Sequence, residues 1–225
     1  VGELYGGPMS RGQGTDDIIY GRVIRNGGES EGERMDLTMD IYTPEDGGQV
    51  ARPLSVTLHG GAFLDGDKRD TTLVEWCRYF ASLGYVAASV DYRQGYRRNV
   101  PSTDEALYRA LKDANAAVRF LLKRDSLLIH SERIFAAGAD AGGIIALNLA
   151  YMREENMPEI IVEEEDTTIV TKQALRRGFD IRAVANLWGA VQDTAILHNA
   201  KIPVISFQSK EDPVIPYGAG HPFDA

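Results

Sequence analysis

The chain has 225 residues, of which 44% are hydrophobic and 25% charged, so its composition is that of one ordinary globular domain and not of a disordered or collagen-like chain. Acidic residues outnumber basic ones by 33 to 24, which gives a net charge of −9 and argues against nucleic acid or an anionic membrane as a partner. The single cysteine, Cys77, excludes an internal disulfide and a cysteine-based zinc site. No apolar run reaches the roughly 20 residues of a membrane span. The compartment stays open, a secreted or periplasmic location being preferred over a cytoplasmic one.

The first elements predicted along the chain form an antiparallel β-hairpin. Apolar and more polar residues alternate from residue 34 to residue 42, which is the period of a half-buried strand. Residues 18–24 are expected to form its partner strand. The sequence Asn26-Gly27-Gly28 between the two supplies residues that favour a turn.

From Pro53 onward, short apolar strands alternate with segments of helical periodicity. The strands are expected over residues 54–58, 85–90, 133–137, 181–188 and 203–207, and the helices over 72–83, 104–122 and 141–152. Thr103, with Pro101 just ahead of it, is the expected cap of the second helix. This order predicts an α/β fold in one domain over residues 1–225, with a mostly parallel central sheet, helices on both faces, and ligands at the carboxyl ends of the strands.

An acidic stretch interrupts this alternation. Residues 154–178 include the run Glu163-Glu164-Glu165-Asp166 and are long for a surface connection. A solvated acidic face is the preferred interpretation, and a lid or substrate-facing insertion over residues 155–180 is the alternative.

The glycine spacing around Asp140 carries the first chemical signal. An apolar strand ends in small residues and turns at once into a helix, and Gly138 and Gly142 flank Asp140 as the glycines of a G-x-S-x-G nucleophile elbow flank its serine. Taken alone, this spacing fits equally a glycine-rich turn that serves packing only.

Two further segments lie on either side of this elbow in the chain, in the order found in ester hydrolases: a loop that precedes it and an acid that follows it. His59-Gly60-Gly61-Ala62 comes after the first parallel strand, where an HGGG-type loop supplies backbone N–H groups to an oxyanion. His59 itself is expected to hold this loop and not to carry protons. Asp212 follows the last predicted strand, where the acid of a catalytic triad sits.

Together, these segments resemble the α/β-hydrolase family, and within it the bacterial carboxylesterases and lipases with an HGG loop, a G-x-S-A-G-G elbow and a D-x-x-V-P acid loop. The resemblance extends from Arg34 to Phe223. It implies an α/β-hydrolase fold, a small-molecule ester as substrate and an acyl-enzyme formed at the elbow. No cofactor is expected, and no metal site, because the four histidines are widely separated and none has a partner at ligand spacing. It also implies oxyanion donors at the N–H groups of Gly61, Ala62 and Ala141. The oligomeric state stays open.

The sequence departs from this pattern at two places. Asp140 stands where the family carries serine. Only 13 residues follow Asp212, whereas a helix, a strand and their connections need roughly 25, so the closing elements and the late histidine are expected to be missing from a fragment or truncated chain. The start at Val1 likewise suggests a removed upstream segment. His221 is the one candidate for the base, and a surface histidine is the preferred alternative.

Asp140 changes the expected chemistry. A carboxylate that attacked an ester would form a mixed anhydride, which is higher in energy than the ester, so direct hydrolysis by Asp140 is unattractive. At a helix N-terminus among backbone N–H donors, an ionised Asp140 could instead occupy the oxyanion hole. The sequence therefore predicts an impaired esterase, with a catalytically dead binding module as the alternative. A dehalogenase or epoxide hydrolase with an aspartate nucleophile comes third.

Overall fold

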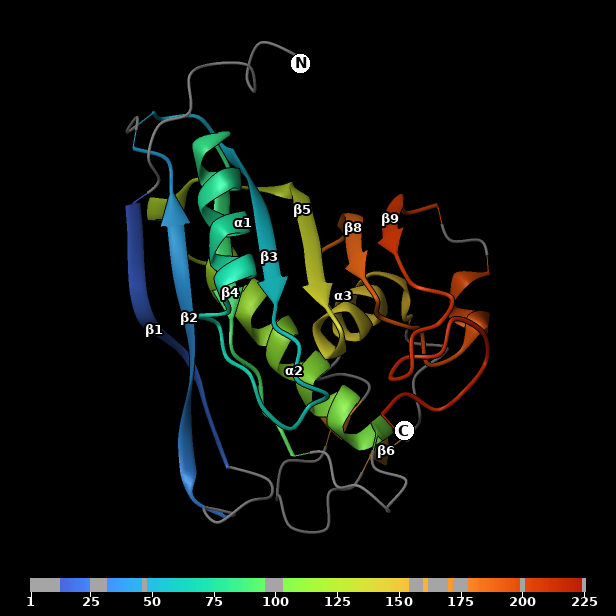
Figure 1. Ribbon diagram of the computed structural model, residues 1–225. Coiled ribbons are helices and arrows are strands. Elements are labelled where there is room, and N and C mark those ends of the chain that lie inside the picture. The colour runs from blue at the N-terminus through green and yellow to red at the C-terminus, as the bar shows by residue number, and fades with distance from the viewer. Residues whose placement is uncertain are drawn as a thin grey trace.

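A computed structural model describes residues 13–24, 32–45, 48–95, 103–153, 160–161, 170–171, 178–198 and 201–223. Its main sheet has seven strands in the order β1-β2-β4-β3-β5-β8-β9 (Figure 1). The bounds of these strands are β1 Gln13–Ile24, β2 Arg34–Thr43, β3 Arg52–Leu58, β4 Val86–Val90, β5 Ile129–Ala139, β8 Ile181–Leu187 and β9 Val204–Phe207.

The pairing of the strands confirms the predicted architecture. β1 and β2 form the expected antiparallel hairpin, and β2 also runs antiparallel to β4. All other neighbours in the sheet, from β4 through β3, β5 and β8 to β9, are parallel. The carboxyl ends of β3, β5, β8 and β9 therefore meet at one edge of the sheet. Three strands begin earlier than predicted, β1 at Gln13, β3 at Arg52 and β5 at Ile129.

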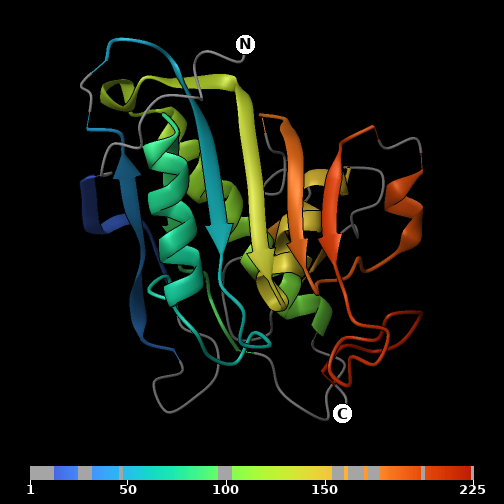
Figure 2. The same ribbon diagram turned by 45° about the horizontal axis from the view of Figure 1, so that its top comes forward.

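Helices cover both faces of this sheet. α1 (Thr71–Ser82) lies on one face, and α2 (Thr103–Leu122) and α3 (Ala141–Tyr151) lie on the other (Figures 1 and 2). α1 begins after Asp70, whose carboxylate accepts hydrogen bonds from the N–H groups of the second and third residues beyond it. Such a cap stabilises a helix start. Thr103, predicted as the cap of α2, is instead its first helical residue.

β2 is more buried than its alternating pattern predicts. Leu37, Met39 and Ile41 face the core as expected, but Asp40 and Tyr42 on the other side of the strand are buried as well. The reason is α1, which packs on that side and forms a small cluster of Cys77 and Ala81 with Tyr42. The ammonium group of Lys68 lies 3.5 Å from the carboxylate of Asp40, so the buried charge has a partner.

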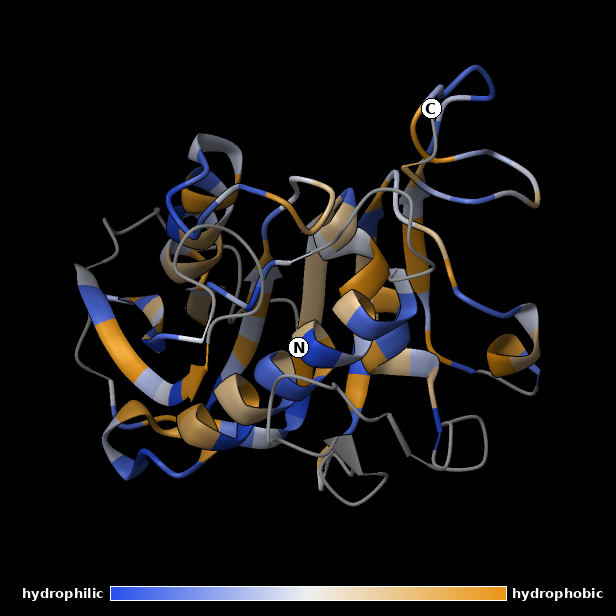
Figure 3. Ribbon diagram, turned by 90° about the horizontal axis from the view of Figure 1, so that it is seen from below, coloured by the Kyte–Doolittle hydropathy of each residue, from blue (hydrophilic) through white to orange (hydrophobic). Residues whose placement is uncertain are grey.

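α3 is the most completely buried helix of the described chain, with all eleven of its residues buried. It has no polar stripe because the sheet, α2 and the chain after β8 surround it. Viewed from the edge where the parallel strands end, hydrophobic colours concentrate in the strands and helices at the middle of the molecule, and hydrophilic colours in the loops around them (Figure 3). The helix that follows the elbow is thus anchored on all sides.

A buried ion pair joins the segment after β4 to α2. The guanidinium of Arg93 donates to both carboxylate oxygens of Asp113, at 3.0 and 3.1 Å, and the Arg93 N–H donates to Asp113 at 2.9 Å. Both side chains are at most 2% exposed. This bidentate geometry fixes the position of the chain where it leaves the sheet after β4.

Of the acidic stretch predicted as a solvated face or lid, the structure describes two short strands, β6 (Ile160–Ile161) and β7 (Val170–Thr171), which pair antiparallel. Most of residues 155–180 lies outside the described residues, so their role stays a prediction. In the part of the chain that is described, no helix has both the length and the apolar character needed to cross a membrane.

Candidate active site

The elbow lies between the end of β5 and the start of α3. Asp140 joins the two with φ 54° and ψ −122°, a backbone conformation that non-glycine residues rarely adopt. A Cβ atom on Gly142 would lie 2.0 Å from the carbonyl oxygen of Leu58, and one on Gly138 would lie 2.2 Å from the carbonyl oxygen of Gly142. Only glycine fits these two positions, because β3, β5 and α3 approach one another at backbone distance.

The carboxylate of Asp140 lies against the loop that follows β3. Its Oδ2 atom accepts hydrogen bonds from the N–H groups of Gly61 and Ala62, each at 2.8 Å. Gly60 lies on the same side, since a Cβ there would be 3.1 Å from the Asp140 Cβ. The structure thus brings the elbow and the HGG loop together as the sequence order suggested. The third expected donor, Ala141, is the buried first residue of α3, and its donor role stays a prediction.

His59 is buried beneath this loop. Its Nδ1 atom lies 2.7 Å from the carbonyl oxygen of Gly60, and its ring stacks on Tyr92 with the centroids 4.3 Å apart. The Tyr92 hydroxyl donates to the His59 carbonyl oxygen at 2.7 Å. Burial lowers the pKa of His59. These contacts place His59 under the loop and 1% exposed, away from the face where a substrate would reach Asp140.

A charged network that sequence reasoning missed supports the loop from the other side. Asp91 accepts from the Lys68 N–H at 2.6 Å and from the Thr38 hydroxyl at 2.9 Å. The Lys68 ammonium donates to Asp17 at 2.8 Å and also lies near Asp40 and Asp91. Burial alone would lower the pKa of Lys68, but these carboxylates outweigh it and raise that pKa. The one sequence signal that could have indicated part of the network is the Asp91-Tyr92-Arg93 segment directly after β4.

Asp212 lies in the loop beyond β9. Its Oδ1 atom accepts from the N–H groups of Val214 and Ile215 at 2.8 and 2.9 Å, and its Oδ2 atom from the Gln208 amide at 3.1 Å. Hydrogen bonds from Ile215 and Val214 lower the pKa of Asp212. Asp212 is therefore a partly exposed, ionised carboxylate at the same edge of the sheet as the elbow.

His221 is not brought together with Asp212. Its side chain is exposed and, among the described residues, has no hydrogen bond or ion pair. Phe223, two residues on, does reach the site region, because it is buried and packs edge-on against Phe63 of the HGG loop at 6.0 Å. The tail thus lies next to the loop while His221 points to solvent.

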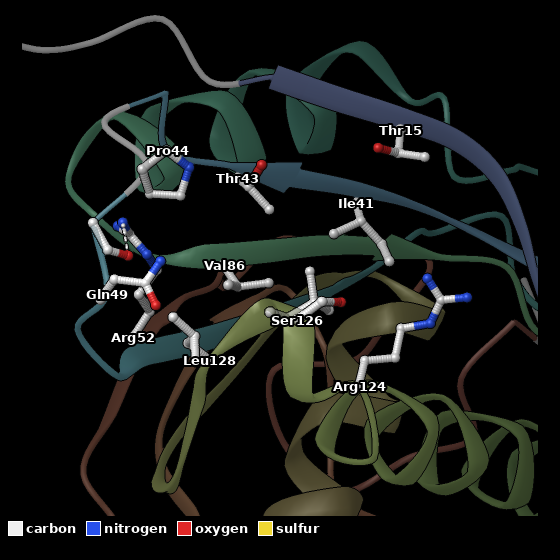
Figure 4. A pocket seen from close by; sticks show the side chains of 12 residues that line it. Thr15, Ile41, Thr43, Pro44, Gln49, Arg52, Val86, Arg124, Ser126 and Leu128 are labelled. Atoms are coloured by element: carbon white, nitrogen blue, oxygen red, sulfur yellow. Dashed lines mark hydrogen bonds between the residues drawn. The ribbon is translucent and has the colours of Figure 1, made fainter.

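A cavity elsewhere in the molecule is separate from this site. It has a volume of about 380 Å³ and is lined by residues at the amino ends of the parallel strands, among them Arg52 of β3, Val86 of β4 and Leu128 before β5 (Figure 4). The elbow and the HGG loop lie at the carboxyl ends. Within the described ranges, no group of three or more His, Cys, Asp or Glu side chains could hold a metal ion.

The family follows from a comparison with protein-family models. Residues 39–212 match the model of the BD-FAE family, a range that contains the HGG loop, the elbow and Asp212. The chain belongs to the BD-FAE family. Within this BD-FAE match, the described elements build an α/β-hydrolase fold.

Solved structures and curated proteins support the same fold for this BD-FAE protein. Esterase 2 of Thermogutta terrifontis, phosphorylated by paraoxon, is similar with a TM-score of 0.59 and 23% identity over 95% of this chain and 76% of that one. Its propionate-bound form matches with a TM-score of 0.59, also at 23% identity. Gibberellin receptor GID1C of Arabidopsis thaliana is 31% identical over 123 residues, and the non-reducing polyketide synthase ascC of Acremonium egyptiacum 25% identical over 122. Each of these two matches covers 54% of this chain but only 34% of the receptor and 6% of the synthase.

Proposed function

We propose that this protein is a carboxylic-ester hydrolase of small-molecule esters by descent, and that hydrolysis by this chain is impaired because Asp140 fills its oxyanion hole. The observation that carries the proposal is the pair of 2.8 Å hydrogen bonds from Gly61 and Ala62 to one carboxylate oxygen of Asp140. Those N–H groups come from the loop position where ester hydrolases stabilise the negative oxygen of a tetrahedral intermediate.

The chemistry of ester hydrolysis explains the impairment. A serine at the elbow would lose its hydroxyl proton to a base, its oxygen would attack the ester carbonyl carbon, and the carbonyl oxygen would become an oxyanion in the hole. With Asp140 in that position, the hole already holds a negative oxygen, which repels both the carbonyl oxygen and the charge that develops on it. An ester could enter only by displacing two charge-assisted hydrogen bonds.

Asp212 and His221 are proposed as the acid and the base of the ancestral triad. Support for Asp212 comes from its position after β9 and from the donors that keep it ionised. Support for His221 is limited to the position of its segment, which packs through Phe223 against the HGG loop. For His221 to act, its side chain would have to turn inward from solvent.

The test restores the nucleophile. Wild-type protein and the variants Asp140→Ser, Asp140→Asn and Asp140→Ser/His221→Ala are incubated with p-nitrophenyl acetate, and released p-nitrophenol and the intact protein mass are followed. We expect no turnover by the wild type or by Asp140→Asn, whereas Asp140→Ser should either turn over or carry an acetyl group on the introduced serine. If the wild type hydrolyses the ester and Asp140→Asn does so as well, hydrolysis takes place at another site and the proposal is overturned. A loss of activity in the double variant would support His221 as the base.

A binding module is the second candidate. A protein whose oxyanion hole is filled by its own carboxylate does not turn over esters, but the rest of its fold is intact. The similarity to a protein named as a gibberellin receptor supports this candidate. A well-folded Asp140→Ser variant that neither acylates nor turns over would favour it. Aspartate-nucleophile chemistry on alkyl halides or epoxides has less support, since Oδ2 of Asp140 is engaged by two donors and the BD-FAE match does not favour it.

A further inference from the structure

The cavity at the amino ends of the parallel strands is lined by three separate parts of the chain. Thr15 and Ile41 come from the β1–β2 hairpin, Val86 begins β4, and Leu127 and Leu128 lie in the connection between α2 and β5 (Figure 4). The volume of about 380 Å³ lies within the range of about 300–1,000 Å³ that is usual for small-molecule sites. The cavity is therefore large enough for a small organic ligand.

Two arginines lie at opposite ends of this cavity. Arg52 is at one end and Arg124 at the other, with Val86 between them (Figure 4). Both side chains are positively charged, because arginine does not lose its proton in proteins. Among the described residues that line the cavity, none is an aspartate or a glutamate. In a chain with a net charge of −9, this local excess of positive charge favours an anionic ligand.

The carboxylate next to the hairpin part of the lining belongs to the other face of the sheet. A Cβ atom on Gly14 would lie 3.7 Å from Oδ1 of Asp16 and 3.5 Å from the ring of Tyr42, so Asp16 is on the side of Tyr42. Ile41 lines the cavity, and successive residues of a strand project to opposite faces. Glu45, beyond the end of β2, is exposed and outside the lining. Neither carboxylate therefore occupies the place of an anion in the cavity.

Arg124 is oriented by the end of α2. Its guanidinium carbon lies 4.7 Å from the centroid of the Phe120 ring, one helical turn earlier. Among the described residues, Arg124 has no side-chain hydrogen bond or ion pair. Asp125, the next residue, is exposed and outside the lining. Stacking on an aromatic face leaves the N–H edge of a guanidinium able to bind a carboxylate.

Arg52 is held at the other end by backbone groups. Its N–H donates to the carbonyl oxygen of Leu128 at 2.7 Å. Its guanidinium donates to the carbonyl oxygens of Gly84 and Gly48, at 3.4 and 3.3 Å. These bonds fix the guanidinium beside the cavity before any ligand arrives, which lowers the entropy that binding has to overcome.

The rest of the lining combines apolar side chains with hydroxyl groups. The apolar members are Ile41, Pro44, Val86, Leu127 and Leu128, and the hydroxyl groups are those of Thr15, Thr43 and Ser126. A bare inorganic anion would contact the arginines but would leave the apolar side chains in water. An alkyl body attached to the anionic group would cover them, and burial of apolar surface stabilises a complex.

We propose that this cavity is a binding site for a small organic carboxylate, with the carboxylate group at Arg124 and the apolar body over Ile41, Val86 and Leu128. A second polar group at the far end of such a ligand would meet Arg52. The site goes beyond the proposed function, because the elbow and the HGG loop take no part in it. It joins the hairpin, β4 and the α2–β5 connection, so an occupied site would stabilise the folded chain.

Binding is tested by NMR on the wild-type protein. Isotope-labelled protein is titrated with sodium hexanoate and, in parallel, with 1-hexanol and with sodium phosphate, while sodium chloride keeps the ionic strength constant. We expect saturable amide shifts at Thr43, Ser126 and Leu128, with half-saturation at about 1 mM hexanoate. The alcohol lacks the charge and phosphate lacks the apolar body, so neither should saturate these shifts at the same concentrations. Saturation by either of them at the concentrations that suffice for hexanoate would overturn the proposal.

Two variants locate the carboxylate group. Arg124→Gln removes the charge from the cavity, and Arg182→Gln removes another exposed arginine, on β8, that is outside the lining. The hexanoate concentration at half-saturation should rise about ten-fold in Arg124→Gln and stay unchanged in Arg182→Gln. Equal affinities in the two variants would overturn the proposal. Wild-type shifts confined to Gly61 and Ala62 would overturn it as well, because they would place the ligand at the elbow, and this result needs no variant to fold.

Discussion

Replacing Asp140 by serine should lower the free energy of unfolding, although the serine supplies the nucleophile that ester hydrolysis needs. The substitution removes the acceptor of two charge-assisted hydrogen bonds, from Gly61 and Ala62. Hydrogen bonds to a charged group contribute roughly 1.5–3 kcal/mol each, which sets an upper limit of about 3–6 kcal/mol for the pair. Gly61, Ala62 and Asp140 are all partly exposed, so water can replace part of what is lost. We expect a net loss of about 1–3 kcal/mol.

Urea unfolding followed by circular dichroism measures this loss. For a chain of this length, each kcal/mol corresponds to a fall of about 2–4 °C in the melting temperature. Asp180→Ser is the matched control, because Asp180 is exposed and has no hydrogen bond in the described structure, and its effect should stay within about 0.5 kcal/mol. An Asp140→Ser variant as stable as the wild type, or more stable, would refute the reasoning that the carboxylate is bound in the hole.

Four further predictions concern stability and reactivity. Asp113→Ala should lower the free energy of unfolding by about 3–5 kcal/mol, because the buried Arg93 loses its carboxylate; a urea titration that shows a loss below about 1 kcal/mol would contradict this. Burial raises the pKa of Cys77 to about 12, so the native thiol should not react with DTNB at about pH 8 but should react once urea unfolds the chain. Gly142→Ala should cost about 3 kcal/mol or more, because its Cβ would lie 2.0 Å from a backbone oxygen of β3, and a melting temperature equal to that of the wild type would rule out the close approach. Burial lowers the pKa of His59, so below about pH 6.5 the unfolded chain binds more protons, and stability should fall as pH drops through the folded pKa. Between about pH 7 and 5, the free energy of unfolding should fall less steeply with decreasing pH in His59→Asn than in the wild type. An identical pH dependence in the two proteins would contradict the assignment to His59.

The sequence predicted the parts of the fold that have a periodic signature. The alternation in β2, the helical spacing in α2 and the glycine spacing around Asp140 each come from local geometry, so each is readable in one segment. The order of HGG loop, elbow and acid loop then placed these segments at one edge of a parallel sheet. The suggestion that Asp140 could fill the oxyanion hole followed from the charge of a carboxylate at a helix start.

The supporting network could not be predicted in the same way. Asp17, Asp40, Lys68 and Asp91 are far apart in sequence, and an ion pair between distant residues leaves no spacing pattern. The burial of Tyr42 was missed for a related reason, since it depends on α1, which arrives about thirty residues later in the chain. The side chain of His221 illustrates a third limit, because nearness in sequence to Asp212 did not bring the two into contact.

The most direct test of the central claim is a crystal structure of the protein grown at neutral pH, with the side chain of Asp140 resolved. One carboxylate oxygen should lie within hydrogen-bond distance of the N–H groups of both Gly61 and Ala62, near the 2.8 Å found for each. A carboxylate turned away from these donors, with water or a bound acid in their place, would show that the hole is open and that Asp140 does not block it.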